Sequence, residues 1–297
     1  MHTESVVRVE DMIKRVVIPA AGIGTRLLPA TKEQPKEMLP IFVRSFDGEL
    51  CLKPLLHVIF ENLYEVGLRE FCFITGRGKR SIEDYFTIDN SFVEYLRDRN
   101  KADLAKELTV FYDNLRTANI IFVNQPEPKG FGDAVYRARS FTGTEPFLVH
   151  AGDDLIISNR KRYLRELNGV FEKYRPAVAF CVEKVRDPTE YGVILGEKIA
   201  GNLYRVRKVL EKPRKPPSNI AIVAVYAFGP EIYEAIEKTP KDANNEVQLT
   251  DAIQQLLSEN HEVLGVSLNA FDKRIDIGTP LSYSRALSLL VRTKNLV

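Results

Sequence analysis

The stretch from Lys14 to Pro40 contains the side chains whose types and spacing best suit phosphate chemistry. A β-branched apolar run, Arg15-Val-Val-Ile-Pro19, is followed by small residues and then by two separated cations, Arg26 and Lys36. Small residues let a ligand approach the main chain closely, and backbone N–H groups share phosphate charge with nearby cations. The stretch therefore predicts a nucleoside triphosphate site. The small residues expected to contact the nucleotide are Ala20, Ala21, Gly22 and Gly24.

The glycine spacing separates this loop from two common phosphate-binding motifs. The run Gly22-Ile-Gly-Thr-Arg-Leu27 lacks the third glycine of the dinucleotide fingerprint, and no Gly-Lys-Ser/Thr closes it as in a Walker loop. Prolines at positions 29, 35 and 40 interrupt any long helix, so the segment is expected to wrap as a loop. A glycine pair after a strand is equally often a tight turn, so the glycines alone leave both interpretations open.

Carboxylates lie in two other segments that could border a binding site. Asp153 and Asp154 come directly after a glycine, at the end of the apolar run 146–151. Ligands of open α/β sheets bind at the carboxyl ends of strands, so this position suits a binding site. Asp276 lies in a glycine turn, Ile275-Asp-Ile-Gly278. Taken alone, the Asp153-Asp154 pair could instead form a turn or cap the next helix, and an Asp-Ile-Gly turn is usually structural.

From Gly24 to Pro40, the sequence GTRLLPATKEQPKEMLP closely resembles the signature of the sugar-nucleotide pyrophosphorylases, in particular the UTP–glucose-1-phosphate uridylyltransferases of bacterial and archaeal type. Thymidylyltransferases of the same superfamily more typically have Lys-Gln-Leu-Leu-Pro where this chain has Lys36-Glu-Met-Leu-Pro40. The resemblance implies a nucleotidyltransferase that joins UTP and glucose 1-phosphate into UDP-glucose and pyrophosphate. The implied reaction is a Mg²⁺-dependent in-line displacement at the α-phosphorus.

Two other functions are compatible with the same signature. A glucose-1-phosphate thymidylyltransferase, or a promiscuous sugar-1-phosphate nucleotidyltransferase, is the nearer alternative. A non-catalytic regulatory subunit of the same fold is the more distant one. Such a subunit is expected to have lost Arg26, Lys36 or a metal-binding carboxylate, and this chain retains all of them.

The resemblance also implies roles for individual residues. The implied catalytic cations are Arg26 on the β/γ-phosphates, Lys36 near the α-phosphate and Lys212 on the sugar phosphate. Gln125 and Gly130 are implied to recognise the base, since a carboxamide offers one donor and one acceptor to the uracil edge. The residues implied on the sugar-phosphate side are Tyr191, Gly192, Glu211 and Lys212. The implied Mg²⁺ ligands are Asp153, which also contacts the nucleotide, and Asp276.

The elements that must position these residues predict an α/β fold. Apolar runs at 15–19, 71–75 and 119–123 predict strands, and the periodicity of 54–66 predicts a helix after the first of them. Strand, helix and strand at this spacing form a βαβ unit, which requires parallel strands. The expected fold is a Rossmann-like mixed, mainly parallel sheet flanked by helices.

The rest of the chain is expected to add to this sheet without forming a second domain. Gly201-Asn202 lies between two apolar runs and predicts a hairpin over 191–210. Residues 43–52 predict a polar, hairpin-like insertion without assigned chemistry. A single nucleotidyltransferase domain is expected over 14–297, after a flexible extension at 1–13.

Two further segments are expected to be helical. Residues 158–174 predict an amphipathic helix with Ser158 as its N-cap. Residues 81–116 are charge-rich and predict a solvated helical flap. The apolar residues expected to face inward from this flap are Phe92, Tyr95, Leu96, Leu104 and Leu108.

Composition indicates where the protein works and with which partners. The chain has 297 residues and a net charge of +2, which favours no nucleic-acid partner. Its three cysteines lack metal-site spacing, and their odd number fits a reduced, cytoplasmic setting. No apolar run approaches the ~20 residues of a membrane span, so no membrane partner is expected. The resemblance implies UTP and glucose 1-phosphate as partners, and a homo-oligomer, either dimer or tetramer.

Overall fold

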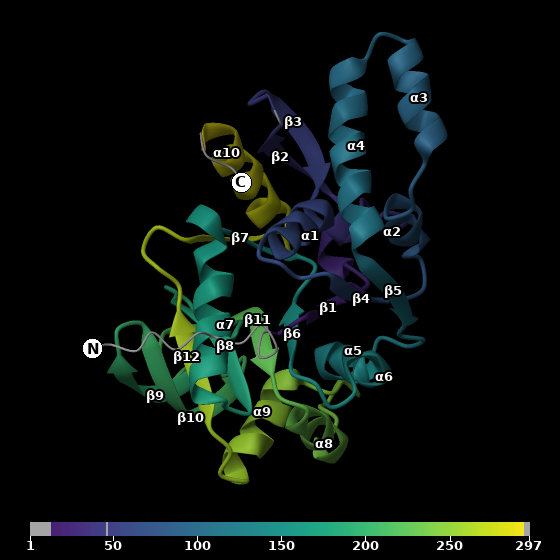
Figure 1. Cartoon of the computed structure of the whole chain (residues 1–297). Helices are drawn as coiled ribbons and strands as arrows, with labels where there is room; N and C mark the ends of the chain where they lie inside the picture. The colour runs from purple at the N-terminus through teal and green to yellow at the C-terminus, as the bar shows by residue number, and fades with distance from the viewer. Residues whose placement is uncertain (1–12, 46, 294–297) are drawn as a thin grey trace, which may run out of the picture.

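The computed structural model describes residues 13–45 and 47–293, which form a nine-stranded sheet with helices on both faces (Figure 1). The β-branched and aromatic runs of the sequence supply its buried strands. In order across the sheet, the strands are β5 (Asn119–Asn124), β4 (Glu70–Thr75), β1 (Arg15–Pro19), β6 (Phe147–His150), β11 (Ile220–Phe228), β8 (Val178–Lys184), β12 (Val263–Ser267), β10 (Leu203–Glu211) and β9 (Gly192–Ala200).

Strand direction confirms the predicted fold class. Strands β5, β4, β1 and β6 run parallel to one another, and β12 is parallel to β8. β11 is antiparallel to both β6 and β8, and the hairpin of β9 and β10 continues the sheet in antiparallel fashion. The sheet is therefore mixed and largely parallel in its core. Because β1 and β6 are parallel neighbours, the loops that follow them leave the sheet at the same edge.

Alternating side chains of β1 enter two separate hydrophobic cores. Val16 and Ile18 pack with the core that contains α1, α4, α7 and α10, whereas Val17 packs with α5, α8 and α9. The helices are α1 (Leu55–Glu65), α2 (Arg80–Tyr85), α3 (Asn90–Asp98), α4 (Ala102–Thr117), α5 (Gly130–Arg137), α6 (Arg139–Thr142), α7 (Arg162–Tyr174), α8 (Glu231–Lys238), α9 (Leu249–Ser258) and α10 (Pro280–Arg292). The two-residue period of the strand thus fixes β1 rigidly between two helical layers.

Two short antiparallel ribbons lie outside the main sheet. β2 (Pro40–Arg44) pairs with β3 (Leu50–Pro54), so the predicted hairpin-like insertion has longer strands than the sequence indicated. β7 (Asp154–Ile157) pairs with β13 (Lys273–Asp276), and this pairing places Asp276 opposite Asp154. The second ribbon, which the sequence did not predict, brings the two candidate metal-binding segments together.

The predicted inward face of the helical flap is wrong for three of its five residues. Phe92, Tyr95 and Leu104 are 47%, 50% and 56% exposed, whereas Leu96 is buried and Leu108 packs against the core. The helices α3 and α4 lie side by side and project from the molecule, so only one face of each is covered (Figure 1). In α3 that face is formed by Val93 and Leu96.

The predicted N-cap of the helix at 158–174 is also wrong. A 3₁₀ turn, Asn159–Lys161, follows Ser158, and α7 begins only at Arg162. Arg160 and Lys161 have φ values of 51° and 50°, a left-handed conformation that interrupts any continuous helix. The Ser158 side chain makes no capping hydrogen bond.

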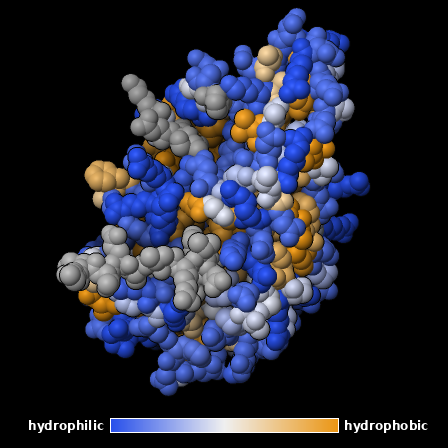
Figure 2. All heavy atoms as spheres, in the orientation of Figure 1, coloured by the Kyte–Doolittle hydropathy of each residue, from blue (hydrophilic) through white to orange (hydrophobic). Residues whose placement is uncertain are grey.

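Residues 1–12 of the predicted flexible extension, residue 46 of the insertion and residues 294–297 lie outside the described residues; Ile13 is buried. Figure 2 shows one face of the molecule, which is mostly hydrophilic with scattered apolar patches. Within residues 13–45 and 47–293, no helix has both the length and the apolar character that a bilayer crossing requires.

Candidate active site

Two adjoining cavities lie beside the carboxyl ends of β1 and β6. The larger has a volume of about 750 Å³ and the smaller about 380 Å³. Both volumes fall within the ~300–1,000 Å³ typical of small-molecule sites. Asp153 and Phe131 line both cavities, so the two spaces meet at these side chains.

The smaller cavity collects the residues predicted to contact the nucleotide. Those that line it are Ala21, Gly22, Gly24, Lys36, Gln125, Gly130 and Asp153. Ala20 is the exception, because it is buried and its N–H donates to the Ile74 carbonyl oxygen at 2.8 Å. Its main chain is thus engaged at the end of the sheet, and it lines neither cavity.

The larger cavity collects the residues predicted on the sugar-phosphate side, together with both candidate metal ligands. Those that line it are Asp153, Tyr191, Gly192, Glu211, Lys212 and Asp276. Arg26, which was predicted on the β/γ-phosphates of the nucleotide, lines this larger cavity and not the smaller one. The β9–β10 hairpin contributes Gly192 at one end and Glu211 at the other, and register pairs these two residues directly. The predicted hairpin therefore explains how residues about 20 positions apart share one wall.

Lys36 and Asp153 form an ion pair where the two cavities meet. Burial alone would lower the pKa of Lys36, but the carboxylates of Asp153 and Glu37 outweigh it and raise the pKa above its ordinary value. Burial would raise the pKa of Asp153, yet the ammonium of Lys36 holds that pKa below its usual range. Both groups are consequently charged at neutral pH.

A second ion pair lies behind the first. Lys79 Nζ donates to Glu37 Oε2 at 2.8 Å, and the two residues are only 5% and 1% exposed. Burial raises the pKa of Glu37, and the neighbouring cations Lys79 and Lys36 partly offset that rise. A Cβ on Gly152 would lie 3.3 Å from Glu37 Cγ, so the Glu37 side chain supports the turn that leads to Asp153.

The loop beside the smaller cavity is held by main-chain contacts. Gly132 N–H donates to the Val247 carbonyl oxygen at 2.9 Å, and Val247 N–H donates to the Lys129 carbonyl oxygen at 2.8 Å. Gly130 has φ +94°, and a Cβ there would lie 2.7 Å from the Val247 oxygen. Only glycine fits this close backbone approach, so the loop has one well-defined position.

Gln125 lies in this cavity with its amide nitrogen already engaged. Nε2 donates to Asp133 Oδ2 at 2.7 Å and to the Gly130 carbonyl oxygen at 3.2 Å, which uses both of its hydrogens. The expectation that this amide offers one donor and one acceptor to a base therefore needs correction. It offers only Oε1, which accepts no hydrogen bond from the described residues.

The donor set in the larger cavity fits Mg²⁺. Within the part of the chain that the structure describes, no three His, Cys, Asp or Glu side chains cluster as a complete metal site. Asp153 and Asp276 nevertheless line one cavity. Mg²⁺ is typically held by one or two carboxylates together with substrate phosphates, so two carboxylates beside a phosphate-sized space suit it.

Arg26 lies next to Asp276. Asp276 Oδ1 accepts from Gly278 N–H at 2.6 Å, which fixes the carboxylate in the glycine turn. A Cβ on Gly278 would lie 2.9 Å from both Arg26 Nη2 and Asp276 Oδ1. The cation from the first loop and the carboxylate from the last strand therefore face the same space.

Arg274 is the main site residue that sequence reasoning missed. Its Nε donates to both Asp154 carboxylate oxygens at 2.8 Å, and its Nη1 donates to Glu183 at 3.1 Å. Its guanidinium also lies 4.8 Å from the ring centroid of Tyr191. The two-residue strand period was the available signal, because Arg274 and Asp276 share a face of β13.

These contacts define the role of Asp154, which the sequence left open. Burial raises the pKa of Asp154 to about 6, although the Arg274 guanidinium opposes the rise. Asp154 is 4% exposed and both of its oxygens accept from Arg274. Asp154 thus anchors Arg274 in the wall of the larger cavity.

Thr250 is a second missed residue. Its Oγ1 donates to Glu211 Oε2 at 2.7 Å, and it lines the larger cavity together with Gln248. A Cβ on Gly192 would lie 2.7 Å from Thr250 Cγ2, so the start of α9 packs tightly against the hairpin. Thr250 fixes the carboxylate that was predicted to hold the sugar.

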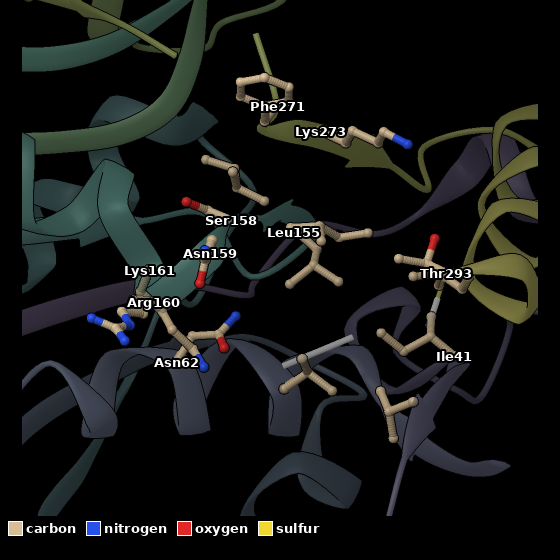
Figure 3. Close-up of a pocket in the computed structure, with 15 residues that line it drawn as sticks. Ile41, Asn62, Leu155, Ser158, Asn159, Arg160, Lys161, Phe271, Lys273 and Thr293 are labelled. Atoms are coloured by element: carbon tan, nitrogen blue, oxygen red, sulfur yellow. The ribbon is translucent and has the colours of Figure 1, made fainter. Parts of the chain in front are cut away.

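A third cavity, of about 300 Å³, lies apart from these residues (Figure 3). Its apolar lining includes Ile41 and Leu155, and Arg160, Lys161 and Lys273 lie around it. None of the predicted site residues and no carboxylate lines it. The paired cavities are therefore the candidate active site.

The chain is similar to a known protein family, to known relatives and to solved structures. The profile of the nucleotidyl transferase family matches residues 15–292. The UTP–glucose-1-phosphate uridylyltransferase of Bacillus subtilis strain 168 is 37% identical over 289 residues, covering 96% of this chain and 93% of that protein. The crystal structure of a UDP-glucose pyrophosphorylase complexed with UDP-glucose has a TM-score of 0.81 at 33% identity, covering 95% and 99% of the two chains. A UTP-bound UGPase from Acinetobacter baumannii has a TM-score of 0.82 at 29% identity, covering 96% of each chain.

The buried Glu37–Lys79 pair generates a stability prediction. Lys79→Met should lower the free energy of unfolding by about 3–5 kcal/mol, because it leaves Glu37 buried without its partner. The pKa of Glu37 is already raised by burial and would rise further, so the deficit should grow as pH increases from about 5 to about 8. Urea denaturation at both pH values measures this.

Two variants control for other effects of the Lys79 change. Arg80→Met, at a side chain that is 88% exposed, should stay within about 0.5 kcal/mol of the wild type. The double variant Glu37→Gln/Lys79→Met should recover part of the loss. A Lys79→Met protein as stable as the wild type at both pH values would contradict the interpretation.

Proposed function

Because the chain belongs to the nucleotidyl transferase family, we propose that it works as a UTP–glucose-1-phosphate uridylyltransferase. It is an enzyme that joins UTP and glucose 1-phosphate into UDP-glucose and releases pyrophosphate. The observation that carries this conclusion is the Lys36–Asp153 pair at the junction of the two cavities. A nucleotide in the smaller cavity and a sugar phosphate in the larger one would meet at these side chains.

The reaction needs no general base. A phosphate monoester has a second pKa of about 6, so the attacking oxygen of glucose 1-phosphate is already largely deprotonated at neutral pH. His150 is fully buried, and burial lowers its pKa to about 4, so it does not serve as a proton carrier at neutral pH. The site must instead hold the two phosphates in line and neutralise the charge of the leaving pyrophosphate.

Two cations of the site are suited to that task. We assign Lys36, which lines the smaller cavity, to the α-phosphate, and Arg26, which lines the larger cavity, to the β/γ-phosphates. A triphosphate that reaches both cations would pass the junction of the two cavities at Asp153. When a triphosphate binds, Lys36 exchanges the Asp153 carboxylate for a phosphate oxygen. Because its charge is partly buried and held in place before the reaction, it would stabilise the transition state more than a solvated lysine would.

The hairpin residues are assigned to the sugar phosphate. Glu211, fixed by Thr250, would accept hydrogen bonds from sugar hydroxyls, and Lys212 would place a point charge on the phosphate. Lys212 Nζ lies 3.1 Å from Glu211 Oε1, so the two groups reach the same ligand. Tyr191 and Gly192 complete this wall of the cavity.

Asp153 and Asp276 are the proposed Mg²⁺ ligands. Each is supported by its place in the larger cavity, and Asp276 is further oriented by the Gly278 N–H. Bound there, Mg²⁺ would neutralise phosphate charge that the protein cations do not reach. The homo-oligomer and the cytoplasmic location remain predictions.

The function is tested by a substrate matrix. Purified protein with Mg²⁺ should release pyrophosphate fastest with UTP and glucose 1-phosphate, among UTP, dTTP, CTP, ATP and GTP and several hexose 1-phosphates. Equal or faster turnover with dTTP would instead identify the thymidylyltransferase or promiscuous alternative. A complete lack of turnover with every pair would favour the regulatory subunit.

Metal removal tests the carboxylate assignment. Chelation with EDTA should abolish turnover, and added Mg²⁺ should restore it, because the bound Mg²⁺ again neutralises part of the phosphate charge. Asp153→Asn should resist rescue at any Mg²⁺ concentration, whereas Asp98→Asn, at an exposed helix position, should behave as the wild type. Turnover that survives chelation would refute the assignment.

Lys36→Ala tests the charge on the α-phosphate. The rate should fall on the order of 10²–10³-fold, as for loss of one preorganised transition-state charge donor. Lys32 lies on the same loop with a side chain that is 77% exposed, so Lys32→Ala is the matched control and should keep full activity. Unchanged turnover in the Lys36 variant would remove this residue from the chemistry.

A further inference from the structure

Charged groups outside the smaller cavity hold the Gln125 amide in one orientation. Nε2 donates to Asp133 Oδ2 at 2.7 Å. Arg137 donates to the same carboxylate, from Nη2 to Oδ1 at 3.1 Å and from Nε to Oδ2 at 3.4 Å. An ionised carboxylate only accepts hydrogen bonds, so only the NH₂ end of the amide can face Asp133.

The surroundings of Gln125 reinforce this orientation. Its second amide hydrogen is donated to the Gly130 carbonyl oxygen at 3.2 Å, and Gly130 is itself pressed against Val247. Rotating the amide by half a turn would place Oε1 against two acceptors. Gln125 is 5% exposed and lines the cavity, whereas Asp133 does not line it.

We propose that Asp133 is a positioning residue for nucleobase selection, acting through Gln125. It keeps Oε1 turned to the cavity, so the site presents an acceptor to the edge of the base. Uracil carries an N–H at ring position 3, which can donate to Oε1, whereas the ring nitrogen of cytosine at that position is itself an acceptor. This orientation of the Gln125 amide thus favours UTP over CTP. Because thymine has the same N3–H as uracil, the orientation does not distinguish UTP from dTTP.

This inference rests on the proposed function, and Asp133→Asn tests it. In the variant, Arg137 would donate to the asparagine oxygen, and the asparagine NH₂ would then face Gln125 and draw Oε1 inward, opposed by only one of the two acceptors, the Gly130 carbonyl oxygen. Nε2 would turn to the cavity, where it suits the cytosine acceptor. The ratio of kcat/KM for UTP to that for CTP should fall at least about tenfold, with the CTP value rising, because a mispaired buried polar group is penalised strongly.

Three further variants make the result specific. Arg137→Met keeps the carboxylate, so its UTP-to-CTP ratio should stay within about threefold of the wild type. Gln125→Leu removes the recognising group and sets the ratio expected without any selection. Asp133→Ala leaves Gly130 as the only inward acceptor and should give an intermediate ratio, which provides a second test should the asparagine variant not fold.

The outcomes separate this inference from the proposed function. A wild-type enzyme that prefers CTP, or that has no turnover with UTP, would refute the proposed substrate itself. A wild-type preference for UTP that a folded Asp133→Asn or Asp133→Ala protein retains in full would overturn only the role of Asp133. Equal losses of kcat/KM for both nucleotides would likewise show that Asp133 is merely structural.

Discussion

The ion pair between Lys36 and Asp153 joins segments 117 residues apart and defines where the chemistry takes place. It forms because β1 and β6 are parallel neighbours, so the loops that follow them leave the sheet at one edge. The other candidate site residues, except Ala20, line the two cavities that meet at this ion pair. The hairpin of β9 and β10 lines the larger cavity, and the loop at 129–132 contributes Gly130 to the smaller cavity and Phe131 to both.

Placing several charges in a partly buried site is expensive unless each has a partner. The structure meets this constraint by pairing each positive side chain with a negative one, Lys79 with Glu37 and Lys36 with Asp153. Arg274 and Asp154 form a second such arrangement beside it. Because the charges are fixed before any substrate arrives, little reorganisation is needed when phosphate charge develops, and such preorganisation is a major source of catalysis.

Features that depend on local pattern could be predicted from the sequence, and those that depend on distant partners could not. The strand at 15–19 follows from an apolar run, and the helix near 55–65 follows from periodicity. The candidate site residues were implied by the family resemblance, and all of them except Ala20 line the two cavities. Arg274 was missed because its partner Asp154 is 120 residues away. In the flap, spacing alone could not decide whether Phe92 and Tyr95 or Val93 and Leu96 face inward, because both pairs are three residues apart.

The two halves of the site differ in how rigidly they are built, and this has a consequence for specificity. On the nucleotide side, Gly130 and Gly132 contact the Val247 main chain, and the Gln125 amide is fixed by Asp133. On the sugar side, Lys212 has a side chain that is 56% exposed, and it follows directly after the last residue of β10. A backbone-fixed subsite cannot adapt to a wrong base without leaving a polar group unpaired, whereas a flexible cation can follow a phosphate on differently shaped sugars. Base selection is therefore expected to be stricter than sugar selection in this enzyme.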